Sequence, residues 1–133
     1  MAHEGLINVA SGFSVRETVE RLVAFAASHG LVVFARIDHA DGAAKAGLAL
    51  RPTELVIFGH PKGGTPLMQD RQTTGIDLPI KALAWEDADG KVRLTYNTAE
   101  WIAQRHGLGP AGAQAVAAIA TGLAAAAKAA TTA

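Results

Sequence analysis

Two short polar segments carry most of the residues whose types and spacing could do chemistry. The first, HPKGGTP at residues 60–66, follows an apolar tract and brings a lysine next to two glycines. Lys62 and the backbone amides of Gly64 and Thr65 could hold a carboxylate or a phosphate, because oriented N–H groups and a nearby cation attract anions. The order differs from a Walker loop, in which the lysine follows the glycines. The alternative is a simple corner, with Thr65 capping a short helix that begins at Pro66.

The second segment, DLPIK at residues 77–81, places a carboxylate and an amine four positions apart. Pro79 restricts Leu78 to an extended conformation, which would hold Asp77 and Lys81 at a fixed separation. Such a pair could orient a ligand, or exchange protons if its pKa values were shifted. A structural salt bridge between the two side chains is the plain alternative.

Two histidines stand where predicted strands end. His39 follows Asp38 after one strand, and His60 follows the next strand. With Asp38 or Asp77 they could form a two-histidine, one-carboxylate metal site, or they could tune the protonation of a ligand. This requires the strand ends to converge, whereas a simple antiparallel pair would place the histidines at opposite ends of the sheet. His106 lies at a predicted helix end, where the helix dipole explains a basic residue.

The composition excludes several classes of protein. Half of the 133 residues are hydrophobic, and 12 Lys and Arg balance 12 Asp and Glu, so no overall field favours nucleic acid or an anionic membrane. The chain has no cysteine, which excludes disulfides and thiolate chemistry. The first residues do not resemble a secretory signal, and the alanine-rich tail is weakly hydrophobic for a membrane span. A cytoplasmic protein without a membrane or nucleic-acid partner is expected.

These segments must be positioned by short strands and amphipathic helices. β-Branched and aromatic runs bounded by glycine and proline predict strands, and a 3.6-residue apolar period predicts helices. The predicted elements are a strand at 5–10, a helix from Ser14 to His29, strands at 31–37 and 55–58, a weak helix within 40–50, a hairpin at 81–96, a helix from 97 to 106 and a last helix that opens at Pro110. Residues 1–133 thus form one α+β domain with helices mainly on one face of the sheet.

The hairpin leaves an apolar surface on the second face of the predicted sheet. Leu83 and Trp85 share one side of their strand, and the central strands are apolar on both sides. Large exposed apolar patches are uncommon on monomers. A homodimer is therefore expected.

The ordered phrases FARIDHADGAAKAGLALRPTELVIFGHPKGGTPLMQD, IDLPIKALAWEDADGKVRLTYN and AQRHGL make residues 5–108 resemble the domain of unknown function 302 family. The resemblance implies a β-α-β4-α arrangement similar to that of the TATA-binding protein, commonly seen as a dimer, and no established reaction. The matching motifs are Asp38-His39, Pro61, Gly64-Thr65-Pro66, Asp77-Leu78-Pro79 with Lys81, and Trp85-Glu86-Asp87. His60 departs from the asparagine expected before the proline. Nothing is carried over to residues 109–133, an alanine-rich helix.

Three functions remain open. The first is a small-molecule or anion-binding module whose pocket lies where residues 60–66 meet residues 77–81. The second is an interaction or dimerisation module that uses the apolar face of the sheet. The third is a histidine- or metal-assisted enzyme that uses His39, His60 and Asp77. No cofactor is identified by these residues.

Overall fold

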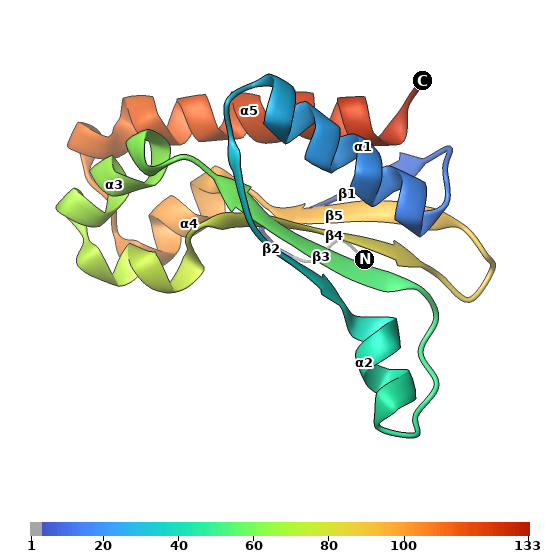
Figure 1. The fold of residues 1–133 in the computed structure, drawn as a ribbon. Helices are drawn as coiled ribbons and strands as arrows, with labels where there is room; N and C mark the ends of the chain where they lie inside the picture. Colours follow the sequence, from blue (N-terminus) through green and yellow to red (C-terminus); the bar gives the residue numbers. More distant parts are fainter. Residues whose placement is uncertain (1–3) are drawn as a thin grey trace.

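The structure is a computed structural model that describes residues 4–133. Five strands form a single antiparallel sheet in the order β1-β5-β4-β3-β2 (Figure 1). The strands are β1 (Leu6–Ser11), β2 (Val32–Asp38), β3 (Thr53–Gly59), β4 (Ile80–Glu86) and β5 (Val92–Asn97). The prediction of an α+β fold is confirmed.

Two long helices, α1 (Val15–Ser28) and α5 (Ala113–Thr131), cover one face of this sheet (Figure 1). α1 begins where the sequence predicts, because the Ser14 side chain accepts a hydrogen bond from the Glu17 backbone N–H at 3.1 Å. Its Val19 and Leu22 are buried in the core with Phe58 of β3 and Leu94 of β5. The core is thus a single layer between helices and sheet.

The alanine-rich α5 is a packed element of this core. Leu123, Ala126, Ala127 and Ala130 are each at most 3% exposed. Small side chains let a helix lie close to its neighbours, and α5 contacts α1, β1 and β5. In the described part of the chain, Pro110–Thr131 is the one helical segment long and apolar enough to cross a membrane.

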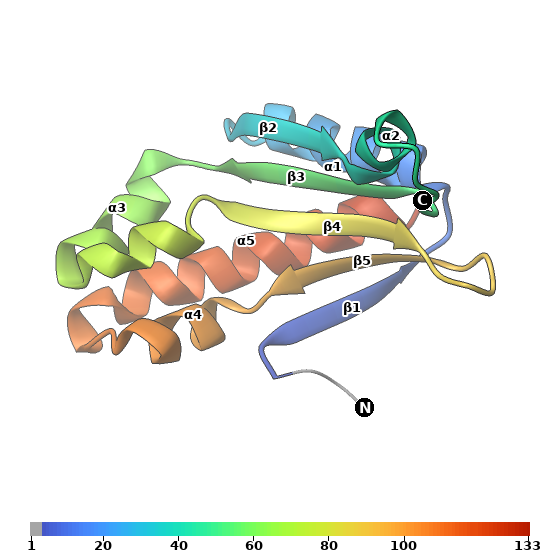
Figure 2. The same cartoon turned by 90° about the horizontal axis from the view of Figure 1, so that it is seen from below.

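Within residues 4–133, no helical layer covers the middle of the opposite face of the sheet, as the view in Figure 2 shows. Partly buried side chains of neighbouring strands point to this face, since they alternate with the buried core residues. Trp85 Nε1 donates to Thr95 Oγ1 at 2.8 Å, and Thr95 in turn donates to Asn8. We call this surface the open face, defined by Ile37, Leu55, Ile57, Leu83, Trp85 and Thr95.

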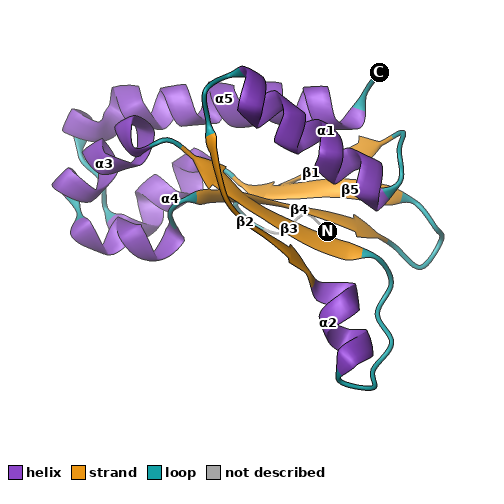
Figure 3. Cartoon of the chain, in the orientation of Figure 1, coloured by secondary structure: helices purple, strands orange, loops and turns teal. Residues whose placement is uncertain are grey.

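The shorter helices lie beyond the ends of the strands (Figure 3). They are α2 (His39–Lys45), α3 (Pro61–Asp70), α4 (Ala99–His106) and the 3-10 turns η1 (Gln72–Asp77) and η2 (Pro110–Gly112). α4 ends at Gly107, which has a left-handed φ of 66°, and the β4–β5 hairpin turns at Gly90 with a φ of 79°. Both features are as predicted.

The start of α3 differs from the prediction. The helix begins at Pro61, with His60 as its N-cap, so Thr65 and Pro66 lie inside it. Proline at a first helical position loses no hydrogen bond, and the His60 Nδ1 atom accepts one from the Lys62 backbone N–H at 3.0 Å. The prediction that Thr65 caps a helix from Pro66 is therefore wrong.

Candidate functional site

A cavity of about 230 Å³ lies where the first turns of α3 meet residues 78–80. β3 delivers Gly59 and His60 to its rim, β2 contributes Phe34, and α5 contributes Ile119. Most of the lining side chains are apolar. They are Phe34, Pro61, Met68, Leu78, Pro79, Ile80 and Ile119, and the remaining positions are Gly59, Gly63, Gly64, His60 and Thr65.

The two polar segments of the sequence meet this cavity unequally. His60, Gly64 and Thr65 line it, as do Leu78 and Pro79 of the second segment. The charged residues predicted to contact a ligand are not among the lining residues; they are Lys62, Asp77 and Lys81. The cavity thus takes its walls from both segments but not their charged groups.

The amides expected to cradle an anion are engaged inside α3. The N–H groups of Gly63 and Gly64 donate to the His60 carbonyl oxygen at 2.9 and 3.2 Å, and the Lys62 N–H donates to the His60 ring. A helix that begins at Pro61 uses these donors for its own first turn. The Gly64 amide is therefore committed to the helix, and the expected cradle of Lys62, Gly64 and Thr65 loses this donor.

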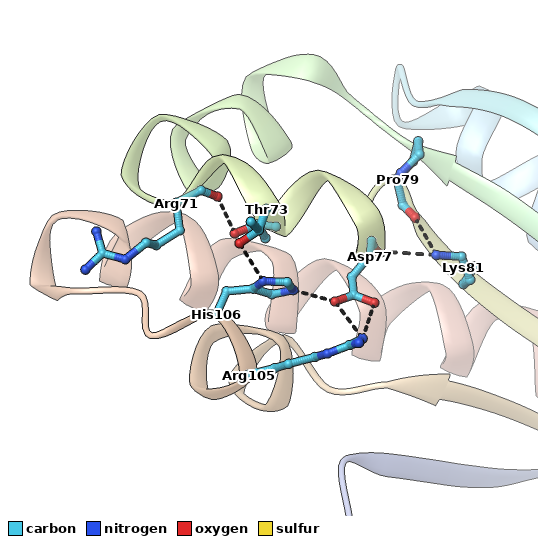
Figure 4. Close-up of polar contacts among 8 residues, drawn as sticks. Arg71, Thr73, Asp77, Pro79, Lys81, Arg105 and His106 are labelled. Carbon is cyan, nitrogen blue, oxygen red and sulfur yellow. Dashed lines mark hydrogen bonds and ion pairs between the residues drawn. The ribbon is translucent and has the colours of Figure 1, made fainter.

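The carboxylate of Asp77 does not pair with Lys81 (Figure 4). Arg105 Nη1 donates to its two oxygens at 2.9 and 3.1 Å, and His106 Nε2 lies 2.5 Å from Oδ2. Lys81 Nζ instead donates to the backbone oxygens of Asp77 at 3.3 Å and Pro79 at 3.2 Å. The predicted Asp77–Lys81 salt bridge is wrong, although Leu78 is extended as expected.

His106, which the sequence explains by the dipole of α4, has a nearly buried side chain with two polar partners. Its side chain is 7% exposed, and its Nδ1 lies 3.0 Å from Thr73 Oγ1 while Nε2 meets Asp77. Hydroxyl, imidazole and carboxylate follow one another as in nucleophilic sites, but none of the three lines the cavity. The cluster instead ties the end of α4 to η1, and the available signal was a basic pair, Arg105-His106, in a last helical turn.

The two strand-end histidines do not converge. Val32 of β2 pairs with Gly59 of β3, while Asp38 pairs with Glu54, so His39 and His60 lie at opposite ends of the sheet. The Asp38 carboxylate caps α2 by accepting from the Asp41 N–H at 2.9 Å. Within residues 4–133 no group of three His, Cys, Asp or Glu residues could hold a metal. His39 therefore lies outside the cavity and the proposed metal constellation is not assembled.

A second hollow, of about 480 Å³, lies at the end of the sheet near His39. Four carboxylates border it, from Asp38, Asp41, Glu54 and Glu86. Arg16 crosses it, with Nε 3.1 Å from Glu54 and Nη2 3.3 Å from Asp38. The buried charge of Glu54 is thereby paired, which explains these residues structurally.

A known protein structure has the same fold as this chain. The crystal structure of an uncharacterized conserved DUF302 protein from Bacillus stearothermophilus superposes with a TM-score of 0.84, covering 96% of this chain and 98% of that one. The two sequences are 19% identical, so this likeness shows the fold.

Curated relatives are more similar in sequence. "Fluoride-specific ion channel FluC 1" of Brucella suis biovar 1 and "Fluoride-specific ion channel FluC 2" of Brucella melitensis biotype 1 are each 58% identical over 118 residues, or 89% of this chain. The chain spans 46% and 44% of those two proteins, less than half of their length.

The family model described as "Domain of unknown function DUF302" matches residues 7–127. The match continues past residue 108 through most of α5, in agreement with the place of that helix in the core. The chain belongs to the DUF302 family.

Proposed function

We propose that the protein is a small-molecule-binding module and that its ligand occupies the cavity between α3, residues 78–80 and Ile119. Ligand sites are typically concave and apolar, with a few placed polar groups. The lining here has that composition, with His60 and Thr65 as its polar side chains. An uncharged ligand is proposed, because the Gly64 amide, Lys81 and Asp77 are engaged elsewhere and Lys62 does not line the cavity.

The observation that carries this proposal is the pair of glycines in the wall of the cavity. Gly63 and Gly64 lie in α3 without a positive φ, and glycine inside a helix costs about 0.5–1 kcal/mol relative to alanine. A Cβ added at Gly63 would meet Ile119 at 3.9 Å, and one added at Gly64 would meet Leu78 at 3.4 Å. Packing therefore tolerates alanine, and the space that a side chain would fill is kept empty.

Filling the cavity tests the proposal. Ligand-observed NMR with a library of small neutral organic molecules is expected to find binders of the wild type that no longer bind Gly63→Leu. Gly122→Leu is the matched control, because Gly122 is also helical and a Cβ there meets nothing within 4 Å. Binding that survives in Gly63→Leu, or that is lost equally in both variants, would refute a ligand in this cavity.

A second proposal follows from the curated relatives. We propose that this chain corresponds to the part of those proteins outside the pore, and acts beside a fluoride channel. A pore needs several spanning helices or a closed barrel, whereas α5 is packed in the core of a sheet through Leu123, Ala126 and Ala130. The pore of the relatives would then reside in the half of their length that this chain does not match.

Reconstitution separates this proposal from the first. The unmatched half of the Brucella suis relative, expressed as a separate polypeptide in lipid vesicles, is expected to retain this chain through washing. Fluoride efflux, followed with a fluoride electrode, is expected to change when the chain is added. A chain that washes away and leaves the efflux rate unaltered would exclude a role at the channel.

A further inference from the structure

We propose that the cavity selects a neutral aromatic molecule that carries one hydrogen-bond acceptor, of the aryl ketone type. The ring would lie among the apolar walls and the acceptor would face the imidazole of His60. This inference rests on the proposed function, since it specifies the ligand class of the same cavity.

The size of the cavity sets the size of the ligand. An apolar cavity of roughly 150 Å³ in a protein core stays dry and admits benzene. The cavity here has a volume of about 230 Å³. It therefore has room for one aromatic ring with a short substituent.

The walls suit an aromatic ring. Phe34 stands at the irregularity between Val33 and Ala35, where β2 shifts its register against β3. Such a bulge re-aims a side chain, and Phe34 lines the cavity while remaining 50% exposed. Met68 lies on another wall, and both thioethers and aromatic rings favour contact with an aromatic partner.

The charge of the walls excludes an ion. Among the described residues that line the cavity, none is an acid, a lysine or an arginine. An ionised group among these side chains would find no partner of opposite charge. The ligand is therefore neutral.

The hydrogen bonding of His60 fixes what its ring can offer. The Lys62 N–H donates to Nδ1 at 3.0 Å, so Nδ1 carries no proton and the neutral imidazole carries its proton on Nε2. Within residues 4–133, Nε2 makes no hydrogen bond to protein. His60 is an exposed residue, so water bonds to this N–H in the free protein, and an acceptor on a ligand in the cavity would replace that water with one net hydrogen bond.

Four probes of similar shape test the ligand class by NMR titration. Acetophenone carries the ring and the acceptor, ethylbenzene lacks the acceptor, cyclohexyl methyl ketone lacks the aromatic ring, and benzoate is charged. Acetophenone is expected to bind about 3- to 10-fold more tightly than ethylbenzene, the range of one net hydrogen bond. Benzoate and cyclohexyl methyl ketone are expected to bind more weakly than acetophenone.

Two variants assign the contacts. His60→Ser retains a capping oxygen for α3 but no group at the position of Nε2, so it is expected to abolish the preference for acetophenone over ethylbenzene. Phe34→Ala is expected to weaken both ligands alike. Val32→Ala is its control, because Val32 is an exposed residue of the same edge strand and does not line the cavity.

The outcomes distinguish the two levels of the proposal. If no probe binds the wild type, and Gly63→Leu differs from it for no small molecule, the proposed function itself fails. If ethylbenzene, benzoate or cyclohexyl methyl ketone binds as tightly as acetophenone, or if His60→Ser keeps the preference, the inferred ligand class fails although the cavity still binds molecules.

Discussion

At the scale of single residues, His60 combines two tasks. Its Nδ1 atom caps α3, and its ring borders the cavity. Histidine is not a preferred capping residue, whereas asparagine is. A residue that caps less well than the alternatives is consistent with a second use for the imidazole.

Removal of this cap should lower stability. We predict that His60→Ala loses about 1 kcal/mol of unfolding free energy, and that His60→Asn is at least as stable as the wild type. Urea denaturation of the three proteins measures both effects. Equal stability of His60→Ala and the wild type would mean that the cap contributes nothing.

Asp87 gives a prediction about pH. The backbone N–H of Lys91, assisted by that of Asp89 and by the Arg93 guanidinium, holds the pKa of its carboxyl below the ordinary value. A lowered folded-state pKa stabilises the fold above the unfolded-state pKa, about 3.9 for Asp, and this contribution is lost as the pH falls through the folded-state pKa.

The stability difference between the wild type and Asp87→Asn should therefore be constant near neutral pH and shrink below about pH 4. Urea titrations at a series of pH values measure it. A difference for Asp87→Asn that persists unchanged into acid would contradict the assigned ionisation.

At the scale of elements, α3 shows why part of the site escaped prediction. The strands, α1 and the β4–β5 hairpin follow from local period, capping and turn residues, all of which are visible in a short window of sequence. The beginning of α3 does not, because Thr65 and Pro66 form a favourable cap locally and the longer helix from Pro61 prevails. The two segments at residues 60–66 and 77–81 do border a cavity, as the sequence predicts. The sequence did not predict that Asp77 and Lys81 would make their contacts away from this cavity.

The partners of Asp77 illustrate a different limit. Arg105 and His106 lie 28 and 29 residues away along the chain, and only the packing of α4 against η1 brings them to the carboxylate. Lys81 is four residues from Asp77, a spacing that brings side chains together in a helix. Lys81 lies in β4, however, and its Nζ donates to backbone carbonyl oxygens. Spacing along the chain therefore suggested the wrong cation.

Alanine in α3 is predicted to stabilise the protein and to reduce the cavity. Gly63→Ala should raise the unfolding free energy by about 0.5–1 kcal/mol, because alanine favours the helix and meets no closer contact than 3.9 Å. Gly122→Ala should stabilise by a similar amount. Urea denaturation measures both unfolding free energies. Small molecules should bind more weakly to Gly63→Ala than to the wild type, and equally well to Gly122→Ala. A Gly63→Ala protein less stable than the wild type would contradict the free space inferred beside Gly63.

Double-mutant cycles can measure the interaction energy between Asp77 of η1 and His106 of α4. We predict a coupling of about 1–2 kcal/mol between Asp77→Ala and His106→Ala, since the two side chains are in direct contact and largely buried. Coupling between Asp77→Ala and Lys81→Met should be near zero, because Lys81 meets only the Asp77 backbone. A larger coupling of Asp77 with Lys81 than with His106 would instead support the salt bridge expected from the sequence.

At the scale of the whole molecule, the open face calls for a cover. Its Leu55, Ile57, Leu83 and Trp85 are partly exposed on adjacent strands, and Ile37 is 39% exposed at the margin. Contiguous apolar surfaces of this kind favour association. We propose that a second copy of the chain covers it.

Analytical ultracentrifugation tests this proposal, because it gives the mass of the protein in solution. The wild type is expected to sediment at twice the chain mass of 13.7 kDa, and Leu83→Lys at the mass of one chain with its circular dichroism retained. Ala88→Lys, in the exposed hairpin turn, is the control and should remain a dimer. A monomeric wild type would leave the open face to another protein, such as the channel half proposed above.

The order of the strands also has a consequence for biosynthesis. β1 leaves the ribosome before the other four strands, yet its neighbour in the sheet is β5, and Leu6 cannot pair with Asn97 until that residue has been translated. Domains fold only when such distant segments are available, and chains emerge N-terminus first. The nascent chain must therefore keep β1 unpaired until β5 has emerged, a period in which chaperone binding would be of greatest use.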